Sequence, residues 1–303
     1  FYATYTNKRS VITAHVTWML VTPRTGRRNH CAFSAIADNS ISVRPNAAMA
    51  ATSLATVLKI LFFSLGCIMV ITLVYTTLKD GSPFRSDVLT PWMSATLIDF
   101  YINVITIAVW IFYKESSLVN AVIWSLVLAL LGSAATCAYF FIKLLNLSTQ
   151  EAEQDPIYYV LLQHQSNGNV TRQTKKKFSV STATILFSVM GIFMLGVIVY
   201  TTIKDGSPLR KDLLYPWMVA TLIDFYINVV PLAIWIAYRE SSWIVAVIWI
   251  VGLVCLGSAA TCGYVVSQLM QLNSGDPLYL ILVKKANRQE FYTASSYGKE
   301  SPR

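Results

Sequence analysis

Residues 80–104 read DGSPFRSDVLTPWMSATLIDFYINV, and residues 205–229 read DGSPLRKDLLYPWMVATLIDFYINV. Around these stretches, residues 74–139 align without a gap onto residues 199–264, and 45 of the 66 positions are identical. A repeat of this length marks a duplicated structural unit, whose halves are called copy one and copy two below. Comparing the copies shows which positions changed after the duplication and which did not.

The composition is typical of a membrane protein. Hydrophobic residues make up 55% of the 303 residues, charged residues only 13%, and the mean hydropathy is +0.53. Soluble domains carry about 25% charged residues. Backbone groups in lipid must be bonded within their own segment, so apolar blocks of about 20 residues are expected to be helices that cross a bilayer core of about 30 Å. We expect six such spans, at residues 58–77, 92–113, 118–143, 183–202, 217–238 and 243–272.

The net charge of +9 does not predict a nucleic-acid partner, because the basic residues lie in tails and connecting loops. Anionic lipid headgroups and topology signals account for basic residues in those places. The five cysteines have no metal-ligand spacing, and four of them lie inside predicted spans, which predicts neither a disulfide framework nor a zinc site. We therefore expect the lipid bilayer as partner and no cofactor or metal.

The apolar blocks divide the chain into five parts. Residues 1–48 are rich in Ser, Thr, Ala and Arg, which is typical of a transit peptide or of translated sequence upstream of an initiator at Met49. Residues 49–145 and 179–272 each hold three predicted spans, and the polar residues 146–178 link them. Residues 273–303 form a polar tail. The matching Asp-Pro pairs at 155–156 and 276–277 each precede a short apolar stretch that predicts an interfacial turn of helix.

The number of spans in each copy predicts its orientation. With three spans a copy, the second copy enters the membrane upside down relative to the first, which gives an inverted-topology repeat. In that arrangement the loops that contain Ser82 and Ser207 face opposite compartments. The expected fold is therefore an all-α integral membrane protein with two tandem three-helix repeats of inverted topology, and a small excess of basic residues favours cytoplasmic termini.

The second helix of each copy is the candidate functional site. Residues 91–104 and 216–229 match at 13 of 14 positions, whereas residues 59–73 and 184–198 match at only 5 of 15. An aspartate inside a bilayer costs about 2.5–3.5 kcal/mol on insertion scales, so it needs a partner or an aqueous cavity. At helical spacing, polar residues of this helix share one face, and tryptophans extend that face towards both ends. The polar residues are Thr96, Asp99 and Asn103, with Thr221, Asp224 and Asn228 in copy two, and the tryptophans are Trp92 and Trp110, with Trp217 and Trp235.

Two interpretations of these residues remain open. The aspartates could accept a cation, a proton or a polar solute at the bilayer midplane, where inversion would bring the two faces together. They could instead clamp helices, bonded to hydroxyls such as those of Tyr101 or Tyr226. Pro231 stands where copy one has Thr106, and it predicts a kink at a binding site or one used only for packing. The shared GSAATC stretches at 132–137 and 257–262 predict close helix packing.

The stretch at 80–104, with the KESS and GSAATCAY elements at 114–117 and 132–139, resembles a plant family of multi-spanning membrane proteins that carry a domain of unknown function in two copies. The resemblance covers roughly residues 49–288. It implies a multi-pass membrane protein that begins near Met49, and it implies no activity or catalytic residue. If translation starts at Met49, we expect the endomembrane system or plasma membrane rather than a plastid.

Three classes of function fit these features. The first is a small transporter or permeation pathway built on the intramembrane Asp/Asn pairs. The second is a membrane-embedded enzyme that acts on a small lipophilic substrate through the same aspartates, although two nearly identical copies argue against an asymmetric active site. The third is a structural or assembly protein whose polar groups only fasten helices. The sequence has no phosphate-binding glycine loop, paired histidines on a helix or nucleophile elbow, so we do not expect soluble-type catalysis.

Overall fold

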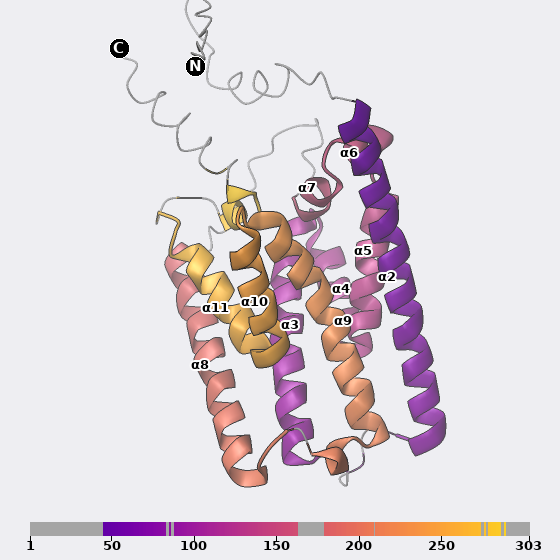
Figure 1. The fold of residues 1–303 in the computed structure, drawn as a ribbon, viewed down its shortest axis with the longest axis vertical. Helices are drawn as coiled ribbons and strands as arrows, with labels where there is room; N and C mark the ends of the chain where they lie inside the picture. Colours follow the sequence, from indigo (N-terminus) through magenta and orange to yellow (C-terminus); the bar gives the residue numbers. More distant parts are fainter. Residues whose placement is uncertain are drawn as a thin grey trace, which may run out of the picture. The chain divides into compact units, whose positions relative to one another are not determined.

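The computed structural model describes residues 45–82, 85, 88–162, 179–208, 210–273, 276, 278–285 and 288, and every regular element of these residues is helical (Figure 1). Within this part of the chain, four helices are long and apolar enough to cross a membrane, as expected of an integral membrane protein. They are α2 (Pro45–Asp80), α3 (Pro91–Lys114), α8 (Val180–Asp205) and α9 (Pro216–Arg239).

The remaining elements are shorter. Four helices of 12 to 14 residues form two consecutive pairs, and the others are two short helices and two 3-10 turns. The pairs are α4 (Leu118–Leu131) with α5 (Ser133–Leu145) and α10 (Trp243–Leu256) with α11 (Ser258–Leu269). The others are α6 (Thr149–Gln154), α7 (Pro156–Leu161), η1 (Lys211–Leu213) and η2 (Leu278–Ile281).

The helices α4 and α5 form a hairpin. The ammonium of Lys143, near the end of α5, lies 2.5 Å from the carboxylate of Glu115, which is three residues before the start of α4. A continuous helix would separate these residues by about 42 Å at a rise of 1.5 Å per residue. The hydroxyl of Tyr139 also donates to Glu115, at 2.7 Å. The chain therefore turns at Gly132 and returns to the side from which α4 starts.

Copy two contains the same hairpin, with its turn at Gly257. Tyr264 and Gln268 of α11 donate to the carboxylate of Glu240, which precedes α10, at 2.9 and 3.1 Å. The predicted single spans at 118–143 and 243–272 are therefore wrong, and the structure has four candidate spans in place of six (Figure 1). The two hairpins start and end on the same side of the molecule and are called re-entrant below. Each hairpin arm holds 12 to 14 residues and extends about 20 Å, which is too short to cross a bilayer core.

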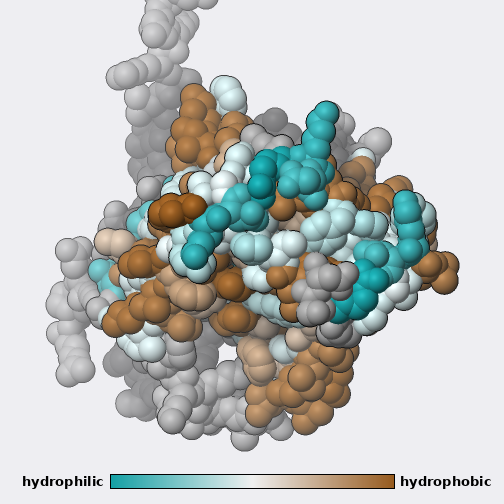
Figure 2. Space-filling model, turned by 90° about the horizontal axis from the view of Figure 1, so that it is seen from below, coloured by the Kyte–Doolittle hydropathy of each residue, from teal (hydrophilic) through white to brown (hydrophobic). Residues whose placement is uncertain are grey.

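The predicted inverted topology is also wrong. Thr90 and Tyr215 stand at the N-cap positions of the equivalent helices α3 and α9, and their hydroxyls lie 3.2 Å apart. The indole of Trp92 donates to the carbonyl of Gly206, at 3.2 Å, in the loop between α8 and α9. The loops of both copies therefore meet at one end of the helices, because two crossings and one hairpin return each copy to its starting side. Figure 2 views this end, where hydrophilic residues lie across the middle and hydrophobic residues around the rim.

Small residues bring each hairpin close to a long helix. A Cβ atom on Gly66 of α2 would lie 3.4 Å from Cβ of Cys137 in α5, and one on Gly191 of α8 would lie 3.1 Å from Cβ of Cys262 in α11. The packing role predicted for the GSAATC stretches is thereby confirmed. Between the copies, α2 packs against α9 and α3 packs against α8.

The two Asp-Pro stretches fold as predicted into short helical turns, α7 and η2. The ammonium of Lys114 donates to the carbonyls of Tyr159 and Leu162 beside α7. The guanidinium of Arg239, the counterpart of Lys114, donates to the carbonyls of Leu280 and Val283, which are the corresponding residues beside η2. Both turns are thus held in the same way at the end of the molecule opposite the two loops.

The boundary predicted at Met49 falls inside α2, which begins at Pro45. The prediction for the rest of residues 1–48 lies outside the described residues, as does that for the basic end of the 146–178 linker.

Candidate functional site

The carboxylates of Asp99 and Asp224 each bind the hairpin of the other copy. Asp99, on α3, accepts the backbone N–H of Ser258 at 2.6 Å, at the start of α11. Asp224, on α9, accepts the backbone N–H of Ser133 at 2.7 Å, at the start of α5. A carboxylate at a helix N-terminus satisfies a free N–H group and interacts favourably with the helix dipole. Two symmetric caps therefore fasten copy one to copy two.

The glycine at each hairpin turn leaves room for the carboxylate. Gly132 and Gly257 have φ angles of 58° and 57°, in the region that favours glycine. A Cβ atom on Gly257 would lie 2.0 Å from Oδ2 of Asp99, and one on Gly132 would lie 2.4 Å from Oδ2 of Asp224. The turn conformation and the close approach of the carboxylate both require the absence of a side chain.

The asparagines one turn further along are completely buried and differ between the copies. Oδ1 of Asn103 accepts the hydroxyl of Thr261 at 2.8 Å, which adds a second link from α3 to α11. Neither side-chain polar atom of Asn228 has a partner among the described residues. Thr96 and Thr221 lie on the predicted face, but each hydroxyl donates to a carbonyl of its own helix, at 2.8 and 2.9 Å.

The four tryptophans show the same difference between the copies. The indole N–H of Trp92 reaches Gly206, and that of Trp110 donates to the carbonyl of Leu161 at 3.0 Å. The indole nitrogens of Trp217 and Trp235 are buried without a partner in the described part of the chain. Among the described residues, the predicted polar face along α3 leaves only Nδ2 of Asn103 without a hydrogen-bond partner, whereas the face along α9 leaves both polar atoms of Asn228 and two indole nitrogens without one.

A cavity of about 920 Å³ lies beside Trp110 and Trp235. Its walls come mainly from α3, α8, α9, α11 and η2, with Leu118, Phe140 and Leu161 contributed by α4, α5 and α7, and most of the lining residues are apolar. Val109 and Phe112 of α3, with Leu186 of α8, are more than 40% exposed on the surface that would face lipid. Ser179, Asp276 and Tyr279 lie at the end of the cavity near η2. The cavity therefore opens on the side that would face lipid, and these three polar residues lie at one end of it.

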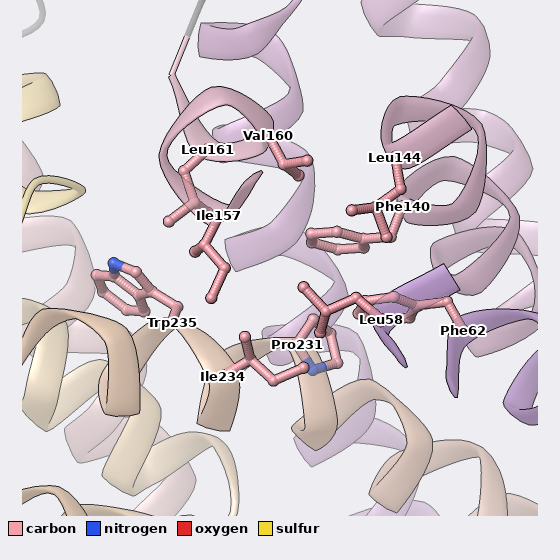
Figure 3. Close-up of a pocket in the computed structure, with 10 residues that line it drawn as sticks. All are labelled: Leu58, Phe62, Phe140, Leu144, Ile157, Val160, Leu161, Pro231, Ile234 and Trp235. Atoms are coloured by element: carbon pink, nitrogen blue, oxygen red, sulfur yellow. The ribbon is translucent and has the colours of Figure 1, made fainter. Parts of the chain in front are cut away.

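Copy one has an equivalent cavity of only about 20 Å³ (Figure 3). Each of the ten residues that line it has its counterpart among the residues that line the large cavity. Leu58 and Phe140 of copy one correspond to Ala183 and Val265 of copy two, which are smaller. Figure 3 also shows Ile157 of α7 reaching towards α9 at Pro231. Larger side chains and a helical α7 thus fill in copy one the space that copy two leaves open.

Sequence reasoning placed the aspartates on one shared site, and the structure pairs each with a different hairpin instead. Neither Asp99 nor Asp224 lines either of these two cavities. Their role in binding a solute stays a prediction, as does the role of Asn103 and Asn228. Pro231 lines both cavities, within a helix that continues through it.

The large cavity was not predicted. The signal that could have revealed it is the pair of size-reducing differences, Leu58 to Ala183 and Phe140 to Val265, within an otherwise similar repeat. The described residues contain no group of three or more His, Cys, Asp or Glu side chains that could hold a metal ion.

Comparison with known proteins identifies one family. Residues 49–289 match a family model described as "Protein of unknown function (DUF1475)". No curated protein and no solved structure matches the chain.

Proposed function

The chain belongs to this DUF1475 family, and we propose that it is a membrane-embedded carrier that takes an amphipathic molecule from the bilayer into the cavity of copy two. The observation that carries the proposal is the open cavity of about 920 Å³ opposite a filled counterpart of about 20 Å³. A volume near 900 Å³ is within the range of small-molecule sites, which are mostly apolar with a few polar groups.

The shape of the cavity supports an amphipathic occupant. An apolar body would enter between α3 and α8, past the exposed side chains of Val109 and Leu186. A polar end would stay near Ser179 and Tyr279, close to the membrane surface, because burial of an unpaired polar group is costly. A freely water-soluble solute would find few hydrogen-bond partners on the apolar walls of this cavity, so it is not the expected occupant.

The difference between the copies supports a dedicated site. A duplicated protein needs no cavity for stability, because filling a core space is favourable by about 24 cal/mol per Å³ in well-studied cases. Copy one fills its space, and copy two carries Ala183 and Val265 in place of the larger residues. The large cavity remains open although filling it would be stabilising, and we therefore expect it to hold a bound molecule.

The test exchanges residues between the copies. The double variant Ala183→Leu/Val265→Phe installs copy-one side chains in copy two, where the backbone frame is equivalent. We expect this variant to fold and to lose most of the amphipathic molecules that co-purify with the wild-type protein, counted by native mass spectrometry from nanodiscs. The matched control, Val189→Leu/Ile192→Phe, installs the same two residue types on the exposed side of α8, where both native residues are more than half exposed, and should keep the co-purifying molecules. Equal retention by both variants would refute a ligand site in this cavity.

A second candidate function is a permeation pathway along the Asp/Asn faces. The observation in its favour is that Asp99 and Asp224 are not fully buried, although each caps a helix. Asp99→Asn keeps the shape and an acceptor oxygen but loses the charge. A pathway predicts loss of cation or proton flux in liposomes, whereas a cap alone predicts a stability change of about 1–2 kcal/mol and unchanged flux.

A further inference from the structure

The indole N–H of Trp235 is a buried donor beside the large cavity. The Trp235 side chain is only 7% exposed, and it lines the cavity. Its Nε1 atom has no hydrogen-bond partner among the described residues. A buried donor without a partner is destabilising, so native proteins rarely leave one without a reason.

The counterpart in copy one shows which acceptor is missing. Trp110 donates to the carbonyl of Leu161, the last residue of α7, at 3.0 Å. The residue that corresponds to Leu161 is Leu282, just after η2, and it lines the cavity. Arg239 holds the carbonyls of Leu280 and Val283 on either side, as Lys114 holds their counterparts. The η2 segment is therefore docked in register, and yet no carbonyl of the described residues accepts the indole N–H of Trp235.

We propose that Trp235 donates its indole hydrogen bond to an oxygen atom of the molecule that occupies the cavity. This inference rests on the proposed function and narrows the class of ligand. The occupant is an amphipathic molecule with a long apolar body and a neutral oxygen acceptor, such as an ester or ketone carbonyl, set into that body.

The charges around the cavity favour a neutral acceptor over an anionic one. Among the described lining residues there is no lysine or arginine, and the charged residue is Asp276. A carboxylate or phosphate at Trp235 would be buried without a cation, which is far more costly than burial of a neutral carbonyl that accepts one hydrogen bond.

The test compares two probes that differ only in the acceptor. Methyl hexadecanoate and hexadecane are added separately to the protein in nanodiscs, and binding is measured by native mass spectrometry over a range of probe concentrations. We expect the wild-type protein to bind the ester about two- to tenfold more tightly than the hydrocarbon, the range of one net hydrogen bond. Trp235→Phe keeps an aromatic ring and removes the N–H group, so it should bind both probes equally.

Trp110→Phe is the matched control. Trp110 also lines the cavity, but its N–H group is already bonded to Leu161, so this variant should keep the preference for the ester while losing thermal stability. Equal binding of both probes by the wild-type protein, or an unchanged preference in Trp235→Phe, would overturn the role of Trp235 and leave the cavity as a lipophilic site. Failure of both probes to bind, or binding that survives Ala183→Leu/Val265→Phe, would overturn the proposed function itself.

Discussion

Gly132 and Gly257 are the residues on which the connection between the copies depends. Each turns a hairpin with a positive φ, and each admits the carboxylate of an aspartate from the other copy to the first N–H group of the next helix. The aspartates therefore have a structural role whether or not a solute also reaches them. This role gives a physical reason for the close match between α3 and α9, because both helices must present the carboxylate at the same height.

Gly257→Ala should strongly destabilise the protein. Alanine at a φ of 57° costs about 1–3 kcal/mol, and its Cβ would also displace the carboxylate of Asp99. We expect a loss of at least about 2 kcal/mol, measured as a lower unfolding temperature in detergent. Gly196→Ala is the control, because Gly196 lies inside α8 with no atom within 4 Å of an added Cβ, and alanine there should leave the unfolding temperature unchanged or higher. Similar unfolding temperatures for both variants would contradict the cap.

The two arms of each re-entrant hairpin are joined by a carboxylate at the end opposite the turn. In copy one this group is Glu115, which binds Lys143 and Tyr139, and in copy two it is Glu240, which binds Tyr264, Gln268 and Lys285. Burial alone raises the pKa of Glu115, but the hydrogen bonds from Lys143 and Tyr139 and the positive charge of Lys143 and Lys114 outweigh it. The pKa of Glu115 is therefore lowered from its ordinary value of 4.5.

The lowered pKa of Glu115 predicts the pH dependence of the first hairpin. Because the folded pKa lies below the unfolded one, the stabilisation is fully present above about pH 4.5 and is lost as the pH falls through the folded pKa. Glu115→Gln should lower the unfolding temperature at pH 7 and flatten its decrease between pH 5 and about pH 3. Unfolding temperatures of wild type and variant that run parallel over this range would show that Glu115 does not close the hairpin.

At the scale of the whole molecule, two crossings and one hairpin per copy produce parallel repeats. The main contacts between the copies follow from this arrangement. Helix α2 packs on α9, α3 packs on α8, and each aspartate binds the hairpin of the other copy. The two cavities occupy equivalent places in the two halves, and the side chains at positions 58, 140, 183 and 265 make them unequal.

Much of this arrangement could be predicted from the sequence, and the hairpins could not. The repeat, the helices, the membrane class and the importance of Asp99 and Asp224 follow from identity and hydropathy. The apolar run around Gly132 satisfies its backbone bonds equally well as one kinked span or as two short helices, so hydropathy does not separate the two. The mistaken third span then reversed the predicted orientation of copy two. The caps depend on contacts between residues more than 90 positions apart, which local patterns do not contain.

The most direct measurement is the accessibility of single cysteines placed at Ser82 and Ser207. Both residues lie in the loops that join the two long helices of each copy, and both side chains are exposed. In proteoliposomes of a variant without native cysteines, a membrane-impermeant maleimide should label both positions from the same side. A third cysteine at Gln154, at the opposite end of the helices, should be labelled from the other side. Labelling of Ser82→Cys and Ser207→Cys from opposite sides would contradict parallel repeats and the two re-entrant hairpins that produce them.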